Sequence, residues 1–336
     1  MPHTPPWEPG LLASLTGVGP GPSARDKRIA LRAALAAAVP RPGAGGPGTG
    51  GPGTGIEPLV LPGATDALGA RLVEDAGFAA VYATGAGLAN AGFGLPDIGL
   101  ISQTEVADHA GRLTEATRVP LVCDADTGYG GPLAAMRTVR LLERAGVAGL
   151  QLEDQEMPKR CGHFDSHALI PSGHMQTKIA AACEARTDDA LVIIARTDAR
   201  SVHGIDEAIE RGRAYADAGA DVLFVEAPRT VDELALVGRE LAGVPLIVNV
   251  VEGGKTPQLG VAEYAELGFG VVLFANYLMR SMHLAGQEAL AHLKEHGETA
   301  SRAGRMAGWE QRQSLFNLPR FSAAESALDR EYGSGS

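Results

Sequence analysis

The chain has 336 residues, of which 45% are hydrophobic, and its formal net charge is −11 at pH 7. This hydrophobic content is sufficient for a folded core, and the acidic charge argues against nucleic acid or an anionic membrane as a partner. No apolar run approaches the roughly 20 residues that span a bilayer. Three cysteines, an odd and sparse set, suit a reducing cytoplasm better than a disulfide framework. We therefore expect a cytoplasmic protein without a membrane or nucleic-acid partner.

The N-terminal 55 residues predict an extension with one short helix. Residues 1–23 are rich in proline and glycine and lack the basic and apolar regions of a signal peptide, so we expect them to be disordered. An alanine-rich helix is predicted over residues 25–39. The Gly/Pro repeat within residues 40–55 predicts a flexible linker; it contains no lysine, which a phosphate-binding P-loop requires.

From Glu57 onward one pattern recurs: a helical segment ends at Ala-Gly or Leu-Gly, and a short apolar run follows. The clearest copies carry the glycine at Gly77, Gly146, Gly219 and Gly268. A glycine at this place is typical of a left-handed helix C-cap, and the apolar run is typical of a buried parallel strand. Eight strands are predicted, at residues 58–61, 79–83, 120–123, 149–152, 191–195, 222–225, 245–248 and 270–274.

Eight successive strand–helix units predict an α/β fold of the TIM-barrel type, (β/α)8, over residues 56–293, followed by a helical tail over residues 294–336. An open doubly wound sheet is the alternative. No Gly-x-Gly-x-x-Gly follows the first predicted strand, which makes that alternative weaker.

Functional residues of such a barrel are expected just beyond the C-terminal ends of its strands. Almost every predicted strand from the second to the seventh is followed there by polar residues: Thr84, Asp124 with Asp126, Glu153, Arg196 with Asp198, Glu226 and Asn249. Any one of them alone is better explained as a helix cap or a partner of loop backbone. Buried strands need apolar residues for packing, so we interpret the set as a whole as a functional site.

The acidic members of this set predict a divalent metal site. Asp124 and Asp126 alternate along the third strand and therefore share a face, where their charges repel unless a cation neutralises them. With Glu153 from the next strand, the donors are all oxygen, which favours Mg²⁺ or Mn²⁺. Zinc is disfavoured, because Cys161 and His163 have no second Cys/His pair at zinc spacing.

Residues 152–163 read Leu-Glu-Asp-Gln-Glu-Met-Pro-Lys-Arg-Cys-Gly-His. The cations Lys159 and Arg160 bias Cys161 toward the thiolate, so that its thiol can give a proton and its thiolate can take one. Gly162 allows the segment to move or lets backbone come close to a ligand. His163 is either a surface histidine or, as we prefer, part of the closed site. These residues predict a mobile acid/base loop over the metal site.

Two further features point to an anionic substrate. Arg196 comes at the end of an apolar strand and needs an anionic partner. That partner is either Glu226 or Asp198 in a structural ion pair, a carboxylate of the substrate, or both. The turn Thr-Gly-Ala-Gly at residues 84–87 offers a hydroxyl and backbone N–H groups as a carboxylate cradle.

In their order along the chain, these motifs resemble the isocitrate lyase/phosphoenolpyruvate mutase superfamily, over about residues 60–293. The motifs that carry the resemblance are Gly-Leu-Pro-Asp-Ile-Gly at 94–99, Asp-Ala-Asp-Thr-Gly-Tyr-Gly at 124–130, Leu-Glu-Asp-Gln at 152–155, Lys-Arg-Cys-Gly-His at 159–163, Ala-Arg-Thr-Asp at 195–198 and Asn-Val-Val-Glu-Gly-Gly-Lys-Thr-Pro at 249–257.

The resemblance implies a barrel that exchanges its last helix with a neighbour, usually in a homotetramer built as a dimer of dimers. It implies a Mg²⁺ ion reached by four acids, Asp97, Asp124, Asp126 and Glu153. The residues around the substrate would be Tyr82, Thr84, Gly85, Ala86, Gly162, His163, Arg196 and Asn249. The catalytic residues would be Cys161, which protonates the departing enolate, with His163, Arg196 and Glu226.

The subgroup is indicated by two segments. Phosphonopyruvate-forming mutases carry Lys and Asn-Ser on the loop, where this chain has Cys-Gly-His, which favours the carbon–carbon lyase branch. Residues 251–257 resemble dimethylmalate lyase, oxaloacetate hydrolase and carboxyphosphoenolpyruvate mutase more than methylisocitrate lyase. Relatives commonly continue the loop with Gly-Lys, whereas residues 164–167 here read Phe-Asp-Ser-His.

The resulting prediction is a Mg²⁺-dependent lyase that cleaves a carbon–carbon bond of a small anionic 2-hydroxy- or 2-oxo-dicarboxylate. Two alternatives remain open at this point. One is a phosphonomutase of the carboxyphosphoenolpyruvate type, which forms a C–P bond at the same metal. The other is a barrel of the same family without catalysis.

Overall fold

The computed structural model of the chain describes residues 21–39, 57–159 and 168–332. Its centre is a closed barrel in which each parallel strand pairs with the next along the chain and the last pairs with the first. The strands are β1 (Leu59–Ala64), β2 (Val81–Ala83), β3 (Leu121–Asp124), β4 (Gly149–Glu153), β5 (Val192–Thr197), β6 (Val222–Val225), β7 (Leu246–Asn249) and β8 (Val271–Phe274). The predicted (β/α)8 barrel is thus confirmed.

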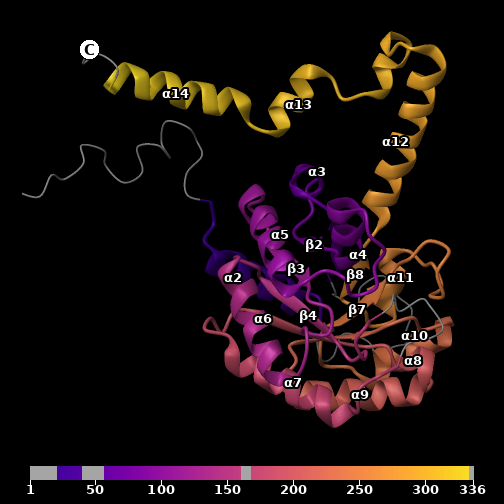
Figure 1. Cartoon of the computed structure of the whole chain (residues 1–336). Helices are drawn as coiled ribbons and strands as arrows, with labels where there is room; N and C mark the ends of the chain where they lie inside the picture. The colour runs from indigo at the N-terminus through magenta and orange to yellow at the C-terminus, as the bar shows by residue number, and fades with distance from the viewer. Residues whose placement is uncertain (1–20, 40–56, 160–167, 333–336) are drawn as a thin grey trace, which may run out of the picture. The chain divides into compact units, whose positions relative to one another are not determined.

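Helices connect successive strands and surround the barrel (Figure 1). The longer ones are α3 (Ala67–Asp75), α5 (Gln103–Ala116), α6 (Pro132–Arg144), α7 (Ser172–Ala185), α9 (Ile205–Asp217), α10 (Val231–Glu240) and α11 (Val261–Glu266). Short turns of helix follow β2 and β5, namely α4 (Gly85–Gly87) with a π-turn (Leu88–Gly92), and α8 (Ala199–Val202). Each of the four glycines predicted to end a helix has a positive φ, between 85° and 106°, as a left-handed cap requires: Gly77, Gly146, Gly219 and Gly268.

The core has two layers. One layer lies between the strands and the surrounding helices, and the other fills the barrel, where side chains such as Val122, Ile194 and Phe224 meet. Strand β4 is buried along its whole length, as the near-continuous apolar strands of a parallel barrel require.

Helix α2 (Ala24–Ala37) packs against the interior of the barrel at the end opposite the strand C-termini. Its Leu31 and Leu35 are buried in the same cluster as the barrel-filling side chains. Lys27 Nζ donates to the carbonyl oxygens of Thr114 and Thr117 at 2.8 and 2.6 Å. The sequence assigns this helix to the N-terminal extension, whereas the structure places it in one compact unit with the barrel, Ala24–Met282, because its leucines complete the core.

The chain from His283 onward belongs to a second compact unit. Helix α12 (Tyr277–His296) leads into it, and a 3-10 helix (Ala300–Arg305), α13 (Trp309–Leu315) and α14 (Leu318–Tyr332) follow. No side chain of α12 is buried, and its Leu284 and Leu290 are 59% and 69% exposed. None of the described helices is long and apolar enough to cross a membrane.

Candidate active site

A small cavity of about 110 Å³ lies at the C-terminal ends of the strands. Predicted site residues that line it are Tyr82, Thr84, Ala86, Asp97, Asp124, Glu153, Arg196, Glu226 and Asn249. Gly85 and Asp126 lie beside the lining: a Cβ atom on Gly85 would be 2.9 Å from Asp124 Oδ2 and 3.4 Å from Asp126 Oδ1. The predicted loop residues Cys161, Gly162 and His163 are outside the described residues.

Asp124 is the last residue of β3, whereas Asp126 lies beyond the strand and not on it as predicted; both are held by the backbone and by a neighbouring strand. Asp126 has a φ of 48°, and its N–H donates to Asp124 Oδ1 at 3.1 Å. Gln151 of β4 also donates to this oxygen, at 3.4 Å, and accepts a hydrogen bond from Tyr82 at 3.0 Å. Burial, with a smaller contribution from Asp124, raises the pKa of Asp126 to about 6. The fold therefore places two carboxylates where a cation is needed to keep both ionised.

Lys159 supplies a cation to these acids in the structure. Its side chain is 5% exposed, and Nζ lies 2.5 Å from Asp97 Oδ1 and 2.7 Å from Asp126 Oδ1. The sequence interpretation treats Lys159 only as a cation beside Cys161 and misses its place in the cavity lining. The available signal is its closeness along the chain to an acid-rich strand end, because a buried lysine needs carboxylate partners.

The guanidinium group of Arg196 is held by neighbouring carboxylates. Its Nε and Nη2 donate to the two carboxylate oxygens of Asp198 at 3.0 and 2.9 Å, and Nη2 lies 3.1 Å from Glu226 Oε2. Glu153 Oε2 is 3.6 Å from Nε, and the guanidinium carbon lies 5.1 Å from the centroid of the Phe224 ring. Both structural ion pairs considered for Arg196 are present, and the side chain still lines the cavity.

The remaining polar groups divide into those already paired and those with free acceptor capacity. Asn249 Nδ2 donates to Glu226 Oε2 at 3.3 Å. Thr84 Oγ1 accepts from the Gly87 N–H and donates to Asn276 Oδ1, so the hydroxyl of the predicted cradle already has partners. Within the described part of the chain, Glu153 Oε1 and Asn249 Oδ1 are buried without a hydrogen-bond partner. Buried acceptors of this kind are costly unless a ligand or water pairs with them.

The donor chemistry of the cavity fits a hard divalent cation. The described residues contain no ready-made cluster of three His, Cys, Asp or Glu side chains around one point. Mg²⁺ does not require one, because it usually keeps several of its waters and takes one or two protein carboxylates. The unpaired Glu153 Oε1 is compatible with such binding, and so is Gly85, where a side chain would crowd the carboxylates of Asp124 and Asp126.

The fold is a (β/α)8 barrel, and this cavity lies at the C-terminal ends of its strands, where barrels of this class carry their active sites. The chain belongs to the phosphoenolpyruvate phosphomutase family, whose model matches residues 54–294. It is 40% identical to the 2,3-dimethylmalate lyase of Eubacterium barkeri over 80% of this chain and 92% of that protein. It is 44% identical to the probable 2-methylisocitrate lyase 1 of Corynebacterium glutamicum over 78% and 84% of the two chains.

Solved structures agree with this assignment. A crystal structure of 2,3-dimethylmalate lyase, a PEP mutase/isocitrate lyase superfamily member, matches with a TM-score of 0.78 and 33% identity, over 94% of this chain and 96% of that one. A phosphonopyruvate hydrolase in complex with oxalate and Mg²⁺ matches with a TM-score of 0.76 and 28% identity, over 91% and 99%. The predicted superfamily and the predicted class, a lyase, are therefore confirmed.

Proposed function

We propose that this chain is a Mg²⁺-dependent lyase that cleaves a carbon–carbon bond of a small 2-hydroxy- or 2-oxo-dicarboxylate. The observation that carries the proposal is the cavity of about 110 Å³ that joins Arg196 to the acids Asp124 and Glu153. A dicarboxylate is repelled by these acids unless a divalent cation is present, whereas Arg196 offers it a fixed positive group. The named lyases among the relatives support the same reaction class.

In this proposal Asp97, Asp124, Asp126 and Glu153 hold the metal, which is Mg²⁺ or Mn²⁺, partly through its bound waters. When bound, the ion supplies positive charge next to the substrate oxygen on which negative charge develops as the bond breaks. Its support here is the all-oxygen donor set and the raised pKa of Asp126, since burial makes the ionised carboxylate unfavourable without a nearby cation.

The side chains of the chain itself bind the substrate and move the proton. Arg196, oriented by Glu226, pairs with one carboxylate, and Tyr82, Thr84, Gly85 and Ala86 surround the other. Asn249, which lines the cavity, contacts the bound substrate, as do Gly162 and His163 from the loop. Cys161 donates the proton that the departing enolate takes up, and the neighbouring Arg160 stabilises the thiolate that remains.

The phosphonomutase alternative has weaker support. A phosphoenolpyruvate phosphomutase from Streptomyces platensis subsp. rosaceus matches with a TM-score of 0.79, but only at 28% identity. The relatives named as lyases reach 40% and 44% identity. The loop sequence, with cysteine and histidine as proton-transferring groups, also favours the lyase.

The decisive experiment is incubation of the purified protein with Mg²⁺ and a panel of diacids, including 2,3-dimethylmalate, 2-methylisocitrate and oxaloacetate, with products identified by mass. Cleavage of at least one diacid is expected, and the variant Glu153→Gln should lose it. Glu240→Gln is the matched control, because Glu240 pairs with Arg213 on α9 and does not line the cavity. Conversion of a phosphonate or phosphoenolpyruvate substrate, with every diacid intact, would favour the mutase instead.

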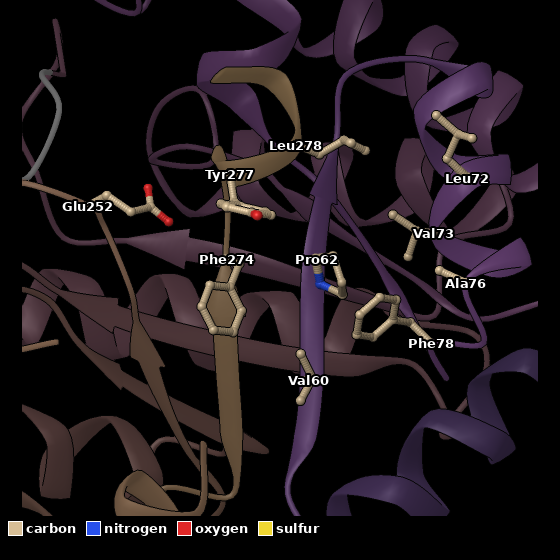
Figure 2. Close-up of a pocket in the computed structure, with 10 residues that line it drawn as sticks. All are labelled: Val60, Pro62, Leu72, Val73, Ala76, Phe78, Glu252, Phe274, Tyr277 and Leu278. Atoms are coloured by element: carbon tan, nitrogen blue, oxygen red, sulfur yellow. The ribbon is translucent and has the colours of Figure 1, made fainter. Parts of the chain in front are cut away.

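We further propose a homotetramer, a dimer of dimers, in which α12 of a second copy covers the barrel. The support is an apolar groove of about 350 Å³ beside β1 and β8. Figure 2 shows the side chains that line it, among them Pro62, Phe78, Phe274 and Leu278. In a barrel of this type the helix after the last strand normally covers this place, and α12 has apolar side chains exposed.

Light scattering tests the assembly. We expect four times the chain mass of 34.7 kDa, and a smaller species for Leu290→Glu on α12. Leu133→Glu is the control, because Leu133 on α6 is also exposed, at 81%, and lies away from the groove. A wild-type protein that is monomeric at micromolar concentration would contradict the exchange of α12.

We make two further proposals, one on location and one on domain order. We propose a cytoplasmic location, supported by the free thiols of Cys123 and Cys183. We also retain the order of an N-terminal extension (1–55), a barrel (56–293) and a helical tail (294–336), with α2 packed as part of the barrel unit.

A further inference from the structure

Asp154 is an acid of the 152–163 segment for which the proposed chemistry has no use. It directly follows β4, is fully buried, and does not line the cavity. Its carboxylate accepts four hydrogen bonds. Two come from the end of β5, from the Thr197 hydroxyl at 2.7 Å and the Asp198 N–H at 3.0 Å. The other two come from α9, from the Tyr215 hydroxyl at 2.8 Å and Arg211 Nη1 at 3.0 Å.

These contacts form a continuous path from α9 to the cavity. Arg211 and Tyr215 stand one turn apart on the same face of α9, and Arg211 Nη1 also donates to the Tyr215 hydroxyl at 3.3 Å. They hold Asp154, and Asp154 holds the backbone N–H of Asp198. The carboxylate of Asp198 in turn accepts both hydrogen bonds from Arg196, at 3.0 and 2.9 Å. Arg196 is the only one of these residues that lines the cavity.

We propose that Asp154 is a positioning residue, which fixes the backbone at Thr197 and Asp198 and thereby sets the angle at which Arg196 enters the cavity. The inference rests on the proposed function in one respect, namely that Arg196 binds a carboxylate of the substrate. Side chains that hold a reacting group matter because a misplacement of about 1 Å can cost roughly a hundredfold in rate. Asp154 acts through other residues and does not touch the substrate.

Asp221, which directly precedes β6, provides a matched control, because its carboxylate also holds β5. Its carboxylate accepts from the Ile193 N–H at 2.9 Å, from Arg186 Nη1 at 2.7 Å and from Arg32 Nη2 at 3.1 Å. It therefore anchors β5 with backbone and arginine donors, as Asp154 does, but at the end of the strand away from the cavity. Asp221→Asn measures how much stability is lost when such an anchor of β5 is weakened. Asp154→Asn measures the same kind of loss together with any effect on the position of Arg196.

The experiment measures the dissociation constant of oxalate, a small dicarboxylate, by calorimetry in the presence of Mg²⁺, together with Tm. If Asp154 positions Arg196, Asp154→Asn weakens oxalate binding by roughly tenfold or more, and Asp221→Asn changes it by less than about twofold, although both lower Tm. Where a diacid is turned over, KM rises in Asp154→Asn by a larger factor than kcat falls, since binding through Arg196 precedes the chemical step.

Oxalate binding and KM that are unchanged in Asp154→Asn, with a Tm loss like that of Asp221→Asn, would show a structural role only and overturn the inference. If Asp154→Asn does not fold, Tyr215→Phe decides, because it removes one hydrogen bond and keeps the ring: a severalfold weaker oxalate affinity supports the inference and an unchanged one overturns it. A wild-type protein that binds oxalate without cleaving any diacid would contradict the proposed function while leaving this comparison intact.

Discussion

Replacement of Arg196 by lysine separates the charge of this residue from its geometry. The arginine makes two hydrogen bonds to Asp198 and lies 3.1 Å from Glu226, and its planar fork is what allows all three contacts at once. A lysine ammonium keeps the positive charge in the same buried place, but it lacks the planar set of N–H donors of a guanidinium group. Arg196→Lys therefore retains the neutralisation of Asp198 and Glu226 and loses the fixed direction toward a substrate carboxylate.

The size of the effect follows from the contacts that are lost. A hydrogen bond to a charged group contributes about 1.5–3 kcal/mol, and each 1.4 kcal/mol corresponds to a factor of ten. Loss of one such bond to the substrate carboxylate predicts a decrease of kcat/KM of roughly ten- to a hundredfold. The effect should fall mainly on KM, because the carboxylate is bound in the ground state as well as in the transition state.

Steady-state kinetics with the diacid that is turned over and oxalate binding by calorimetry both measure this change. Arg200→Lys is the control, because Arg200 also makes a two-pronged contact, with Glu233 at 2.9 and 2.5 Å, but does not line the cavity. We expect near-wild-type kinetics for that variant. If Arg196→Lys and Arg200→Lys have the same KM as the wild type, Arg196 is a structural ion-pair partner and the assignment of the carboxylate site is wrong.

Further predictions address the metal, the proton donor and the core. Chelation should abolish turnover and Mg²⁺ or Mn²⁺ should restore it, so activity that persists in chelator would refute the metal mechanism. Burial raises the pKa of Asp126 from 3.8 to about 6, so the metal-free folded protein binds the extra proton and loses stability as the pH rises through that range; Mg²⁺ should therefore raise Tm more at about pH 7.5 than at about pH 5, and equal shifts would argue against Asp126 as a ligand. Cys161→Ser should reduce cleavage by orders of magnitude with nearly unchanged oxalate binding, because serine is a much weaker acid; near-normal turnover would exclude Cys161 as the donor. Leu31→Ala, at a side chain 1% exposed in the barrel core, should lower the free energy of unfolding by about 3–5 kcal/mol, whereas Ile29→Ala, 50% exposed on the same helix, should cost below about 0.5 kcal/mol. Deletion of residues 1–23 should leave fold and activity unchanged, and deletion of residues 1–39 should not, because it removes α2; equal behaviour of the two truncations would contradict the role given to that helix.

Most of the barrel could be predicted from the sequence, because the signals for its strands and helix ends are local. A strand predicted at residues 222–225 is β6, Val222–Val225, and the strand predicted at 149–152 is β4, Gly149–Glu153. The glycines that end the helices need a positive φ, which only a few residue types adopt readily, so their places in the chain can be read directly. The polar residues at the strand ends are also read directly from the sequence, and all of them except Asp126 and Asp198 line one cavity.

Only the tertiary structure decided the contacts between side chains from different strands and helices. Lys159 reaches Asp97 and Asp126, and Leu31 reaches the interior of the barrel. Asp154 accepts hydrogen bonds from both β5 and α9. Each of these contacts depends on the direction of a side chain after the barrel has closed, and local propensity and spacing carry no information about that direction. The sequence by itself thus determined the barrel, the family and the set of polar strand ends, and the closed barrel decided which of those groups pair with one another and which remain free for a ligand.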